Sequence, residues 1–575
     1  MKKLLQYLGN YKKESILGPL FKLLEASFEL IVPLVMAAII DTGVANADRP
    51  YIMKMSLVLF LLALIGLICA ITAQYFAAKA AIGFTGGVRH ALFAKVQSLS
   101  YAELDKLGTS TLMTRMTSDM NQVQTGLNLA LRLLLRSPFV VFGAMIMAFT
   151  IDVKSAWVFA VIIPLLFVVV FGIMFSCIPL YRRVQGRLDG VLGAAKENLA
   201  GVRVIRAFGK ERQEVESFEK KSGELLSAQL FVGKISALLN PVTYVMINLA
   251  IIAVLRAGAG QVDKGVLTQG QVMALYNYMS QILVELIKMA NLILSMTKAT
   301  ASAKRVAAIL ALESSLPVPA ENPQEDPAAP AVAFDGVTFT YPTGGAPALS
   351  DISFRLERGK TLGIIGGTGA GKSTLIGLIP RFYDVQTGSV AVDGCEVKAY
   401  PLETLRKKIG LVPQKALLFK GTIRENLRWG NENASDEDIR EALAAAQAQE
   451  VVDGKPEGLD YEVETGGKNF SGGQRQRLTI ARALVRKPEV LILDDSASAL
   501  DFATDAALRH ALRKLSWQPA VVIISQRTAS IRFADEILVL DDGKLVGKGT
   551  HDELLQTCAV YREIYDSQFK KEDAR

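Results

Sequence analysis

Residues 362–374 read "LGIIGGTGAGKST", an apolar run that passes through glycines into Lys372, Ser373 and Thr374. The run fits G-x-x-x-x-G-K-[ST], which predicts a strand, a loop and the first turn of a helix. Glycines let backbone N–H groups close around phosphate, and the helix N-terminus adds a partial positive charge. A glycine turn that arose by chance would not be expected to have both an apolar strand before it and the Lys-Ser pair at the required positions after it. We therefore predict a nucleotide-phosphate cradle formed by Gly366, Gly367, Thr368, Gly369, Ala370, Gly371, Lys372, Ser373 and Thr374.

The composition points to a membrane portion joined to a soluble portion. A chain of 575 residues is too long for one core, and 50% of the residues are hydrophobic while only 21% are charged. The net charge of +8 fits basic cytoplasmic loops better than nucleic-acid binding, so no nucleic-acid partner is expected. The four cysteines match neither disulfide nor metal-ligand spacing, which is typical of a reducing compartment.

Six apolar stretches before about residue 300 predict membrane-crossing helices. The clearest, residues 155–180, carries no charge and is longer than the roughly 20 residues that cross a bilayer core. The connections 79–132 and 181–235 are long and rich in Lys and Arg, which places them and both termini in the cytoplasm. The predicted spans are roughly 16–40, 56–78, 133–151, 155–180, 236–256 and 269–295.

Five prolines in residues 316–330 predict an extended linker. Short apolar strands then alternate with helical segments, which predicts an α/β domain with a largely parallel sheet. Within it, residues 537–549 predict a hairpin that turns at Asp542 and Gly543. The expected organisation is a polytopic α-helical membrane domain (1–310), a linker (311–332) and an α/β P-loop domain (333–575).

Further motifs accompany the cradle. "FSGGQRQRLTIARAL" begins at Phe470, "VLILDD" spans residues 490–495, "VPQ" ends at Gln414 and "TFTYP" contains Tyr341. Together these motifs resemble the nucleotide-binding domain of an ATP-binding cassette (ABC) protein. With six spans ahead of it, the whole chain resembles an ABC exporter half-transporter of the multidrug type in a bacterial plasma membrane. Residues 101–119 and 196–218 resemble that family's two intracellular loops.

The resemblance implies ATP and Mg²⁺ as cofactors and assigns a role to each motif. Lys372 is expected on the β- and γ-phosphates, and Tyr341 on the adenine. The implied magnesium ligands are Ser373, Gln414 and Asp494. The signature residues, expected to cap an ATP held by the opposite subunit, are Ser471, Gly472, Gly473 and Gln474. Asp501 is expected at the interface between the two cassettes, and Glu464 where the cassette meets the partner's intracellular loop.

Two positions depart from the family's hydrolytic pattern. A glutamate is expected after Asp494 and a histidine after a later strand, but the chain has Asp495 and Gln526. Aspartate is one methylene shorter, and catalysis tolerates little misplacement. Glutamine donates a hydrogen bond but cannot become a cation. We predict a degenerate site that binds ATP and cleaves it slowly; the alternative is a slow but competent ATPase.

The degenerate site and the intact signature together predict a heterodimer with a second ABC half-transporter. The chain is then expected to export hydrophobic or amphipathic small molecules, as multidrug exporters do, out of the cell, with the lipid bilayer as its surroundings. The alternatives are a lipid or peptide exporter, a slow homodimeric exporter, and an ATP-gated channel or regulatory subunit.

Polar side chains lie on one face of the first and of the sixth predicted span. The residues are Lys22, Glu25 and Glu29 in the first, and Asn277, Gln281, Glu285 and Lys288 in the sixth. Charges at membrane depth face either an aqueous cavity or a pairing partner, and both interpretations stay open. Arg132 and Arg136 are expected to extend to the inner membrane interface.

Overall fold

The computed structural model describes residues 2–317, 319–342 and 344–569. The chain divides into two compact units, residues 1–97 with 110–312, and residues 98–109 with 313–575. Residues 98–109 group with the C-terminal unit, which the boundaries expected from the sequence did not foresee. The first is called the membrane unit and the second the cassette unit.

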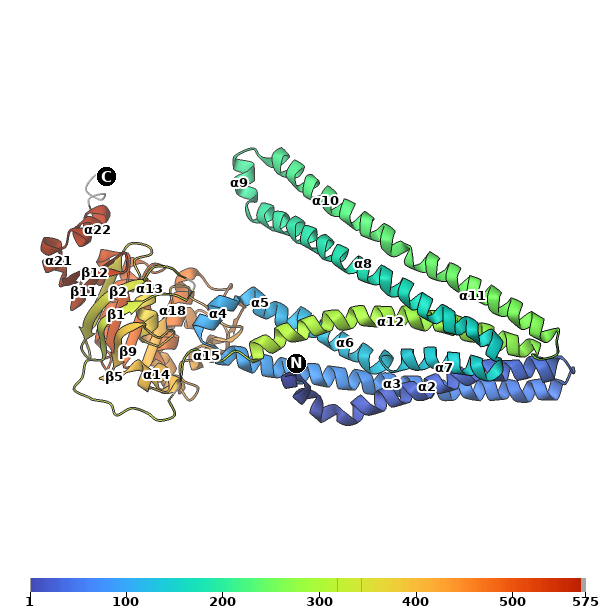
Figure 1. The fold of residues 1–575 in the computed structure, drawn as a ribbon. Coiled ribbons are helices and arrows are strands. Elements are labelled where there is room, and N and C mark those ends of the chain that lie inside the picture. Colours follow the sequence, from blue (N-terminus) through green and yellow to red (C-terminus); the bar gives the residue numbers. More distant parts are fainter. Residues whose placement is uncertain (1, 318, 343, 570–575) are drawn as a thin grey trace. The chain divides into compact units, whose positions relative to one another are not determined.

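The membrane unit is entirely helical in its described part (Figure 1). Its elements are α1 (Lys2–Leu5), η1 (Gln6–Tyr11), α2 (Lys12–Ala38), η2 (Ile39–Val44), α3 (Arg49–Ser98), α5 (Thr109–Thr114), η3 (Arg115–Asp119), α6 (Met120–Leu133), α7 (Arg136–Ile151), α8 (Val153–Ala200), α9 (Val202–Ala207), α10 (Glu211–Ala237), α11 (Leu239–Val262) and α12 (Gln269–Leu310). Six helical segments among the described residues are long and apolar enough to cross a membrane, which confirms the predicted spans.

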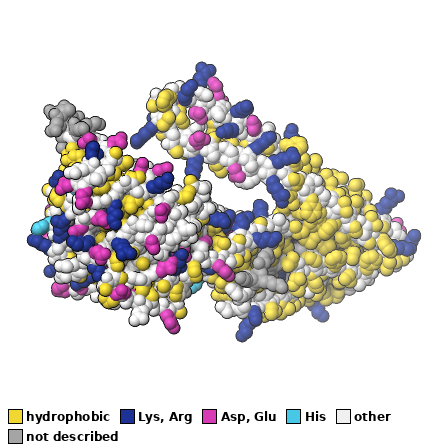
Figure 2. Space-filling view, turned by 60° about the vertical axis from the view of Figure 1, so that its left-hand side comes forward, with side chains coloured by type: hydrophobic (Ala, Val, Ile, Leu, Met, Phe, Trp, Pro, Cys, Tyr) yellow, Lys and Arg dark blue, Asp and Glu magenta, His cyan; other side chains and the backbone are white. Residues whose placement is uncertain are grey.

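The apolar residues of these helices divide between a core and an exposed belt. Buried side chains from α2, α7, α8, α11 and α12 pack into one cluster, in which Tyr278 donates a 2.6 Å hydrogen bond to the carbonyl of Leu30. On α3, by contrast, Phe60 and Ile71 are 64% and 61% exposed. Figure 2 shows hydrophobic side chains crowded over the membrane helices. Lipid is the solvent that makes such a surface stable.

The cassette unit contains three sheets. Its largest sheet has the order β12-β11-β3-β10-β9-β6, parallel except for β12, which confirms the predicted largely parallel sheet. A four-stranded antiparallel sheet has the order β2-β1-β4-β5, and β7 pairs with β8. The strands are β1 (Val332–Phe339), β2 (Leu349–Leu356), β3 (Thr361–Gly366), β4 (Thr387–Val392), β5 (Cys395–Glu396), β6 (Ile409–Val412), β7 (Gly421–Thr422), β8 (Glu462–Val463), β9 (Val490–Asp494), β10 (Ala520–Ile524), β11 (Glu536–Asp541) and β12 (Lys544–Gly549).

Helices complete the unit. They are α4 (Tyr101–Leu107), α13 (Lys372–Leu378), η4 (Val397–Ala399), α14 (Leu402–Lys408), α15 (Ile423–Arg428), α16 (Asp436–Ala445), α17 (Gln449–Asp453), η5 (Gly458–Asp460), α18 (Gly472–Leu484), α19 (Phe502–Arg513), α20 (Thr528–Ile531), α21 (His551–Thr557) and α22 (Ala559–Phe569). The predicted hairpin is confirmed, since β11 and β12 pair antiparallel across Asp542 and Gly543, both with positive φ. Residues 311–331 form neither helix nor strand in their described part, as expected for a proline-rich segment.

The short helix α4 packs within the cassette unit through aromatic and polar contacts. The Tyr101 ring lies 4.5 Å from that of Phe382, and the Tyr383 hydroxyl donates a 2.5 Å hydrogen bond to Asp105. Glu103 caps the start of α4 and accepts a hydrogen bond from the Ser315 amide. The first predicted intracellular loop therefore divides at about residue 109, since its first part belongs to the cassette unit.

Candidate functional site

The loop between β3 and α13 has the conformation that a phosphate cradle needs. Gly369 and Gly371 have φ values of 85° and 93°, which other residues rarely adopt. A Cβ on Gly371 would lie 2.8 Å from the carbonyl oxygen of Ala348, so only glycine fits. The Lys372 ammonium donates to the carbonyls of Gly366 and Gly367 at 2.8 and 2.6 Å, and its burial lowers its pKa.

The end of β9 supplies two carboxylates beside this cradle. Ser373 donates a 3.2 Å hydrogen bond to Asp494, and burial raises the pKa of Asp494. No group of three or more His, Cys, Asp or Glu residues in the described part of the chain could hold a metal by itself. A hydroxyl and one carboxylate suit Mg²⁺, which usually keeps waters and takes its other ligands from phosphates. Ser373 and Asp494 therefore fit a magnesium ion that arrives with a nucleotide.

Asp495 stands on a backbone that is fixed on both sides. Its φ is +47°, its amide donates a 3.0 Å bond to the Ile524 carbonyl, and its own carbonyl accepts one from Ser498 at 2.8 Å. Its carboxylate accepts a long 3.5 Å hydrogen bond from the amide of Gln414. The structure thus brings together the sequence-predicted residues Lys372, Ser373, Gln414, Asp494 and Asp495.

Gln526 follows β10, and its loop is held by a residue that no motif indicated. The side chain of Gln526 is exposed, while its carbonyl accepts a 2.7 Å hydrogen bond from the amide group of Gln568 at the end of α22. The amide oxygen of Gln568 accepts two more bonds, from the Thr528 backbone at 3.0 Å and the Thr528 hydroxyl at 2.9 Å. Gln568 therefore ties the C-terminal helix to both sides of this loop.

Tyr341 lies next to the first turn of α13. Its hydroxyl is 3.0 Å from that of Thr374, and its ring lies edge-on to those of Phe339 and Tyr383 at 5.0 and 5.3 Å. A half-buried aromatic ring beside the cradle is suitably placed for stacking on a base.

The signature residues cap a helix and do not belong to the group of residues around the cradle. Ser471 accepts a hydrogen bond from the Gln474 amide, and the Gln474 side chain accepts one from the Ser471 amide, which completes a capping box on α18. Ser471 and Gly472 are exposed, and a Cβ on Gly472 would meet nothing within 4 Å. Asp501 caps α19 by accepting two bonds from Thr504 at 2.8 and 2.9 Å. Glu464 is exposed ahead of the signature.

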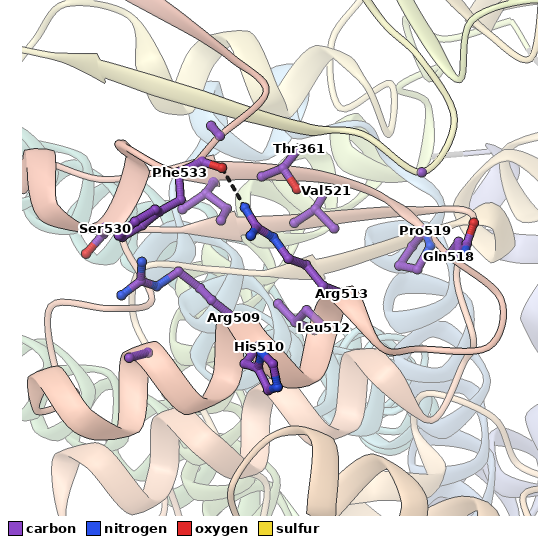
Figure 3. A pocket seen from close by; sticks show the side chains of 14 residues that line it. Thr361, Arg509, His510, Leu512, Arg513, Gln518, Pro519, Val521, Ser530 and Phe533 are labelled. Carbon is purple, nitrogen blue, oxygen red and sulfur yellow. Dashed lines mark hydrogen bonds between the residues drawn. The ribbon is translucent and has the colours of Figure 1, made fainter. Parts of the chain in front are cut away.

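The cassette unit also contains a cavity that lies away from the cradle. It has a volume of about 400 Å³ and includes Thr361, the first residue of β3, whereas the cradle begins at Gly366, the last residue of that strand. In Figure 3 the Arg513 side chain crosses this cavity and donates a 2.6 Å hydrogen bond to the Phe533 carbonyl. The cavity thus shares no residue with the predicted nucleotide site.

The charges that lie between α2, α7 and α12 form ion pairs. Arg136 is 5% exposed and bridges Glu285 at 2.5 Å and Glu29 at 2.6 Å. Glu285 also accepts hydrogen bonds from Ser137 and Lys288. The expectation that Arg136 extends to the membrane interface is therefore wrong, because two carboxylates from other helices hold it inside.

A cavity adjoins these pairs, so the two interpretations of the membrane charges are compatible. The cavity has a volume of about 460 Å³ between α2 and α12. It is lined by Glu29, Val32, Pro33, Met36, Asn277, Ser280, Gln281, Val284, Glu285 and Lys288. Its wall therefore combines apolar side chains with the paired charges, which suits an amphipathic ligand.

The chain is similar to known proteins along its whole length. The ABC transporter transmembrane region family matches residues 15–286, and the ABC transporter family matches residues 349–498. The YfiB protein of Bacillus subtilis, an ABC transporter ATP-binding protein, is 36% identical over 572 residues, covering 100% of this chain and 99% of its own. An ATP-dependent lipid A-core flippase of Vibrio parahaemolyticus is 30% identical, covering 99% and 97%.

The fold also matches a solved structure. A bacterial Atm1-family ABC exporter with ATP bound superposes with a TM-score of 0.81 at 23% identity, over 97% of this chain and 99% of that chain. The chain therefore belongs to the ABC transporter family, as a multi-pass half-transporter with the exporter fold, in which six membrane-crossing helices precede one ATP-driven cassette.

Proposed function

We propose that this chain is one subunit of a heterodimeric exporter with one degenerate ATP site. Its own cradle binds ATP with Mg²⁺ and cleaves it slowly. Its signature segment completes the catalytic site of a partner half-transporter. The observation that carries the proposal is the pair formed by Asp495 on a fixed backbone and Gln526 on the next strand's loop.

The fixed backbone matters because it removes the simplest compensation for a short side chain. An aspartate could replace a glutamate if the strand end moved forward by one bond length. The hydrogen bonds to Ile524 and from Ser498 oppose that movement of Asp495. Phosphoryl transfer depends mainly on positioning and electrostatics, so a retracted carboxylate and an uncharged amide both slow it.

The signature segment supports the other half of the proposal. The capping box of Ser471 and Gln474 is complete, and the exposed Ser471 and Gly472 leave a phosphate room to approach the N-terminus of α18. A homodimer would combine two sound caps with two poor catalytic sites. A partner with a consensus glutamate and histidine would combine this sound cap with sound catalytic residues.

The proposed cargo is a hydrophobic or amphipathic small molecule. Support comes from the cavity between α2 and α12, which joins apolar residues to a paired, overall balanced set of charges. A second candidate is lipid export, favoured by the 30% identity to a lipid A-core flippase along nearly the whole chain. Transport of a fluorescent cationic dye and of a fluorescent phospholipid into proteoliposomes, with the partner present, separates the two.

The heterodimer is tested with the full-length chain in nanodiscs. Alone, the chain should retain uncleaved ATP in the presence of Mg²⁺, and Lys372→Ala should abolish that retention. With a half-transporter that carries the consensus glutamate and histidine, turnover should appear. Ser471→Arg in this chain should then remove it, although the hydrolytic residues lie on the partner. Brisk turnover by the chain alone would refute the proposal.

A further inference from the structure

A groove between α8 and α10 lies where the fourth membrane span enters the cytoplasm. Trp157 and Tyr181, 62% and 53% exposed, flank the apolar part of α8. Such aromatic residues gather at both membrane interfaces. At 1.5 Å per residue the helix between them covers about 36 Å, enough to span a bilayer core of roughly 30 Å. Residues just beyond Tyr181 therefore lie at the level of the cytoplasmic headgroups.

The groove presents two arginines on one face of α8. It has a volume of about 490 Å³, and its lining includes Arg183, Gly186 and Arg187 from α8, and Ser227 and Phe231 from α10. Arg183 and Arg187 are one helical turn apart. Arg187 donates a 2.6 Å hydrogen bond to the Glu224 carbonyl and a 3.4 Å bond to Ser227, which fixes its guanidinium against α10.

The α8 side of the groove favours an anion. Residues 181–193 contain three arginines against one acid, Asp189, which accepts a hydrogen bond from Gln185 on its own helix. Figure 2 shows Lys and Arg side chains along the pair of helices α8 and α10, near the exposed hydrophobic belt of the membrane helices. A Cβ on Gly186 would meet nothing within 4 Å, so the floor of the groove between the two arginines is open.

The groove also has an apolar end. Leu180 lines it on the membrane side, and Phe231 is 56% exposed on α10. Guanidinium groups bind phosphate through paired hydrogen bonds, and the cytoplasmic leaflet is rich in anionic lipid. We propose that this groove binds the phosphate headgroup of an anionic phospholipid, with Arg183 and Arg187 on the phosphate and an acyl chain along Leu180 and Phe231. The site does not depend on the proposed heterodimer or on its cargo.

Native mass spectrometry of the full-length chain, titrated in detergent with dioleoylphosphatidylglycerol, tests the proposal. The chain should retain this lipid more tightly than dioleoylphosphatidylcholine. Each arginine replaced by glutamine should weaken retention about fivefold, and Arg183→Gln with Arg187→Gln together roughly 25-fold. Gly186→Leu should also weaken retention, because it fills the groove and removes no charge.

Arg182→Gln is the matched control, since Arg182 is an exposed neighbour that does not line the groove. It should change retention by less than about twofold. Equal weakening by Arg182→Gln, or unchanged retention in both the double variant and Gly186→Leu, would overturn the proposal. Displacement of the lipid by millimolar inorganic phosphate or glycerol 1-phosphate would also overturn it, because the groove would then be a site for soluble anions. An unchanged thermal midpoint of each variant verifies that the membrane unit, in which the substitutions lie, is folded.

Discussion

Lengthening one side chain should raise ATP hydrolysis by this protein. Asp495→Glu adds one methylene, which extends the carboxylate by about 1.5 Å. Because hydrogen bonds at Ile524 and Ser498 fix the backbone on both sides, the added length becomes reach toward the nucleotide. A misplacement of about 1 Å costs on the order of 10²-fold in rate, so the variant should hydrolyse on the order of 10²-fold faster.

The assay is single-turnover cleavage of radiolabelled ATP by excess full-length protein in nanodiscs, because it separates chemistry from product release. Gln526→His in the same chain should add a further gain, since it supplies a group that can become a cation. Asp495→Asn is the matched control, because it keeps the length and removes the charge, and it should not accelerate cleavage. If Asp495→Glu cleaved bound ATP no more than threefold faster than the unaltered chain, side-chain reach would not be the limiting feature.

Three further tests address particular contacts, and two of them include a control substitution. Gln568→Glu keeps the two hydrogen bonds accepted from Thr528 but loses the donor to the Gln526 carbonyl. The maximal hydrolysis rate should therefore change while the affinity for ATP does not. An equal change in affinity would argue against a positioning role for Gln568. Gly371→Ala should abolish binding of a fluorescent ATP analogue, whereas Gly367→Ala, whose Cβ would meet nothing within 4 Å, should retain it. Glu285→Gln leaves the buried guanidinium of Arg136 with one carboxylate, which should cost about 3–5 kcal/mol of stability and lower the thermal midpoint. Glu25→Gln, in a less buried pair, should cost less. Equal losses of stability in the two variants would refute this account.

Features that depend on consecutive residues could be predicted from the sequence. The cradle is encoded by residues 362–374, because one strand, one glycine loop and one helix start form it. The six spans follow from the length and composition of each stretch, and the hairpin at Asp542 and Gly543 from its turn residues. The departure at Asp495 is likewise visible in the sequence, because only one residue type is compared with another.

Features that depend on distant residues were decided by the tertiary structure. Arg136 and Glu285 are 149 positions apart, and no local periodicity indicates that they pair. Gln568 reaches the Gln526 loop from 42 positions away and belongs to no motif, and α4 groups with the cassette unit through the rings of Phe382 and Tyr383.

The same limit applies to Asp495. The sequence shows that its side chain is short. The hydrogen bond to Ile524, which prevents the backbone from moving to compensate for that short side chain, forms only when β9 and β10 pair. Local sequence determines which groups are available, because propensity and spacing act over a few residues. Packing determines which of those groups meet, because it joins elements whose separation along the chain leaves no local signal.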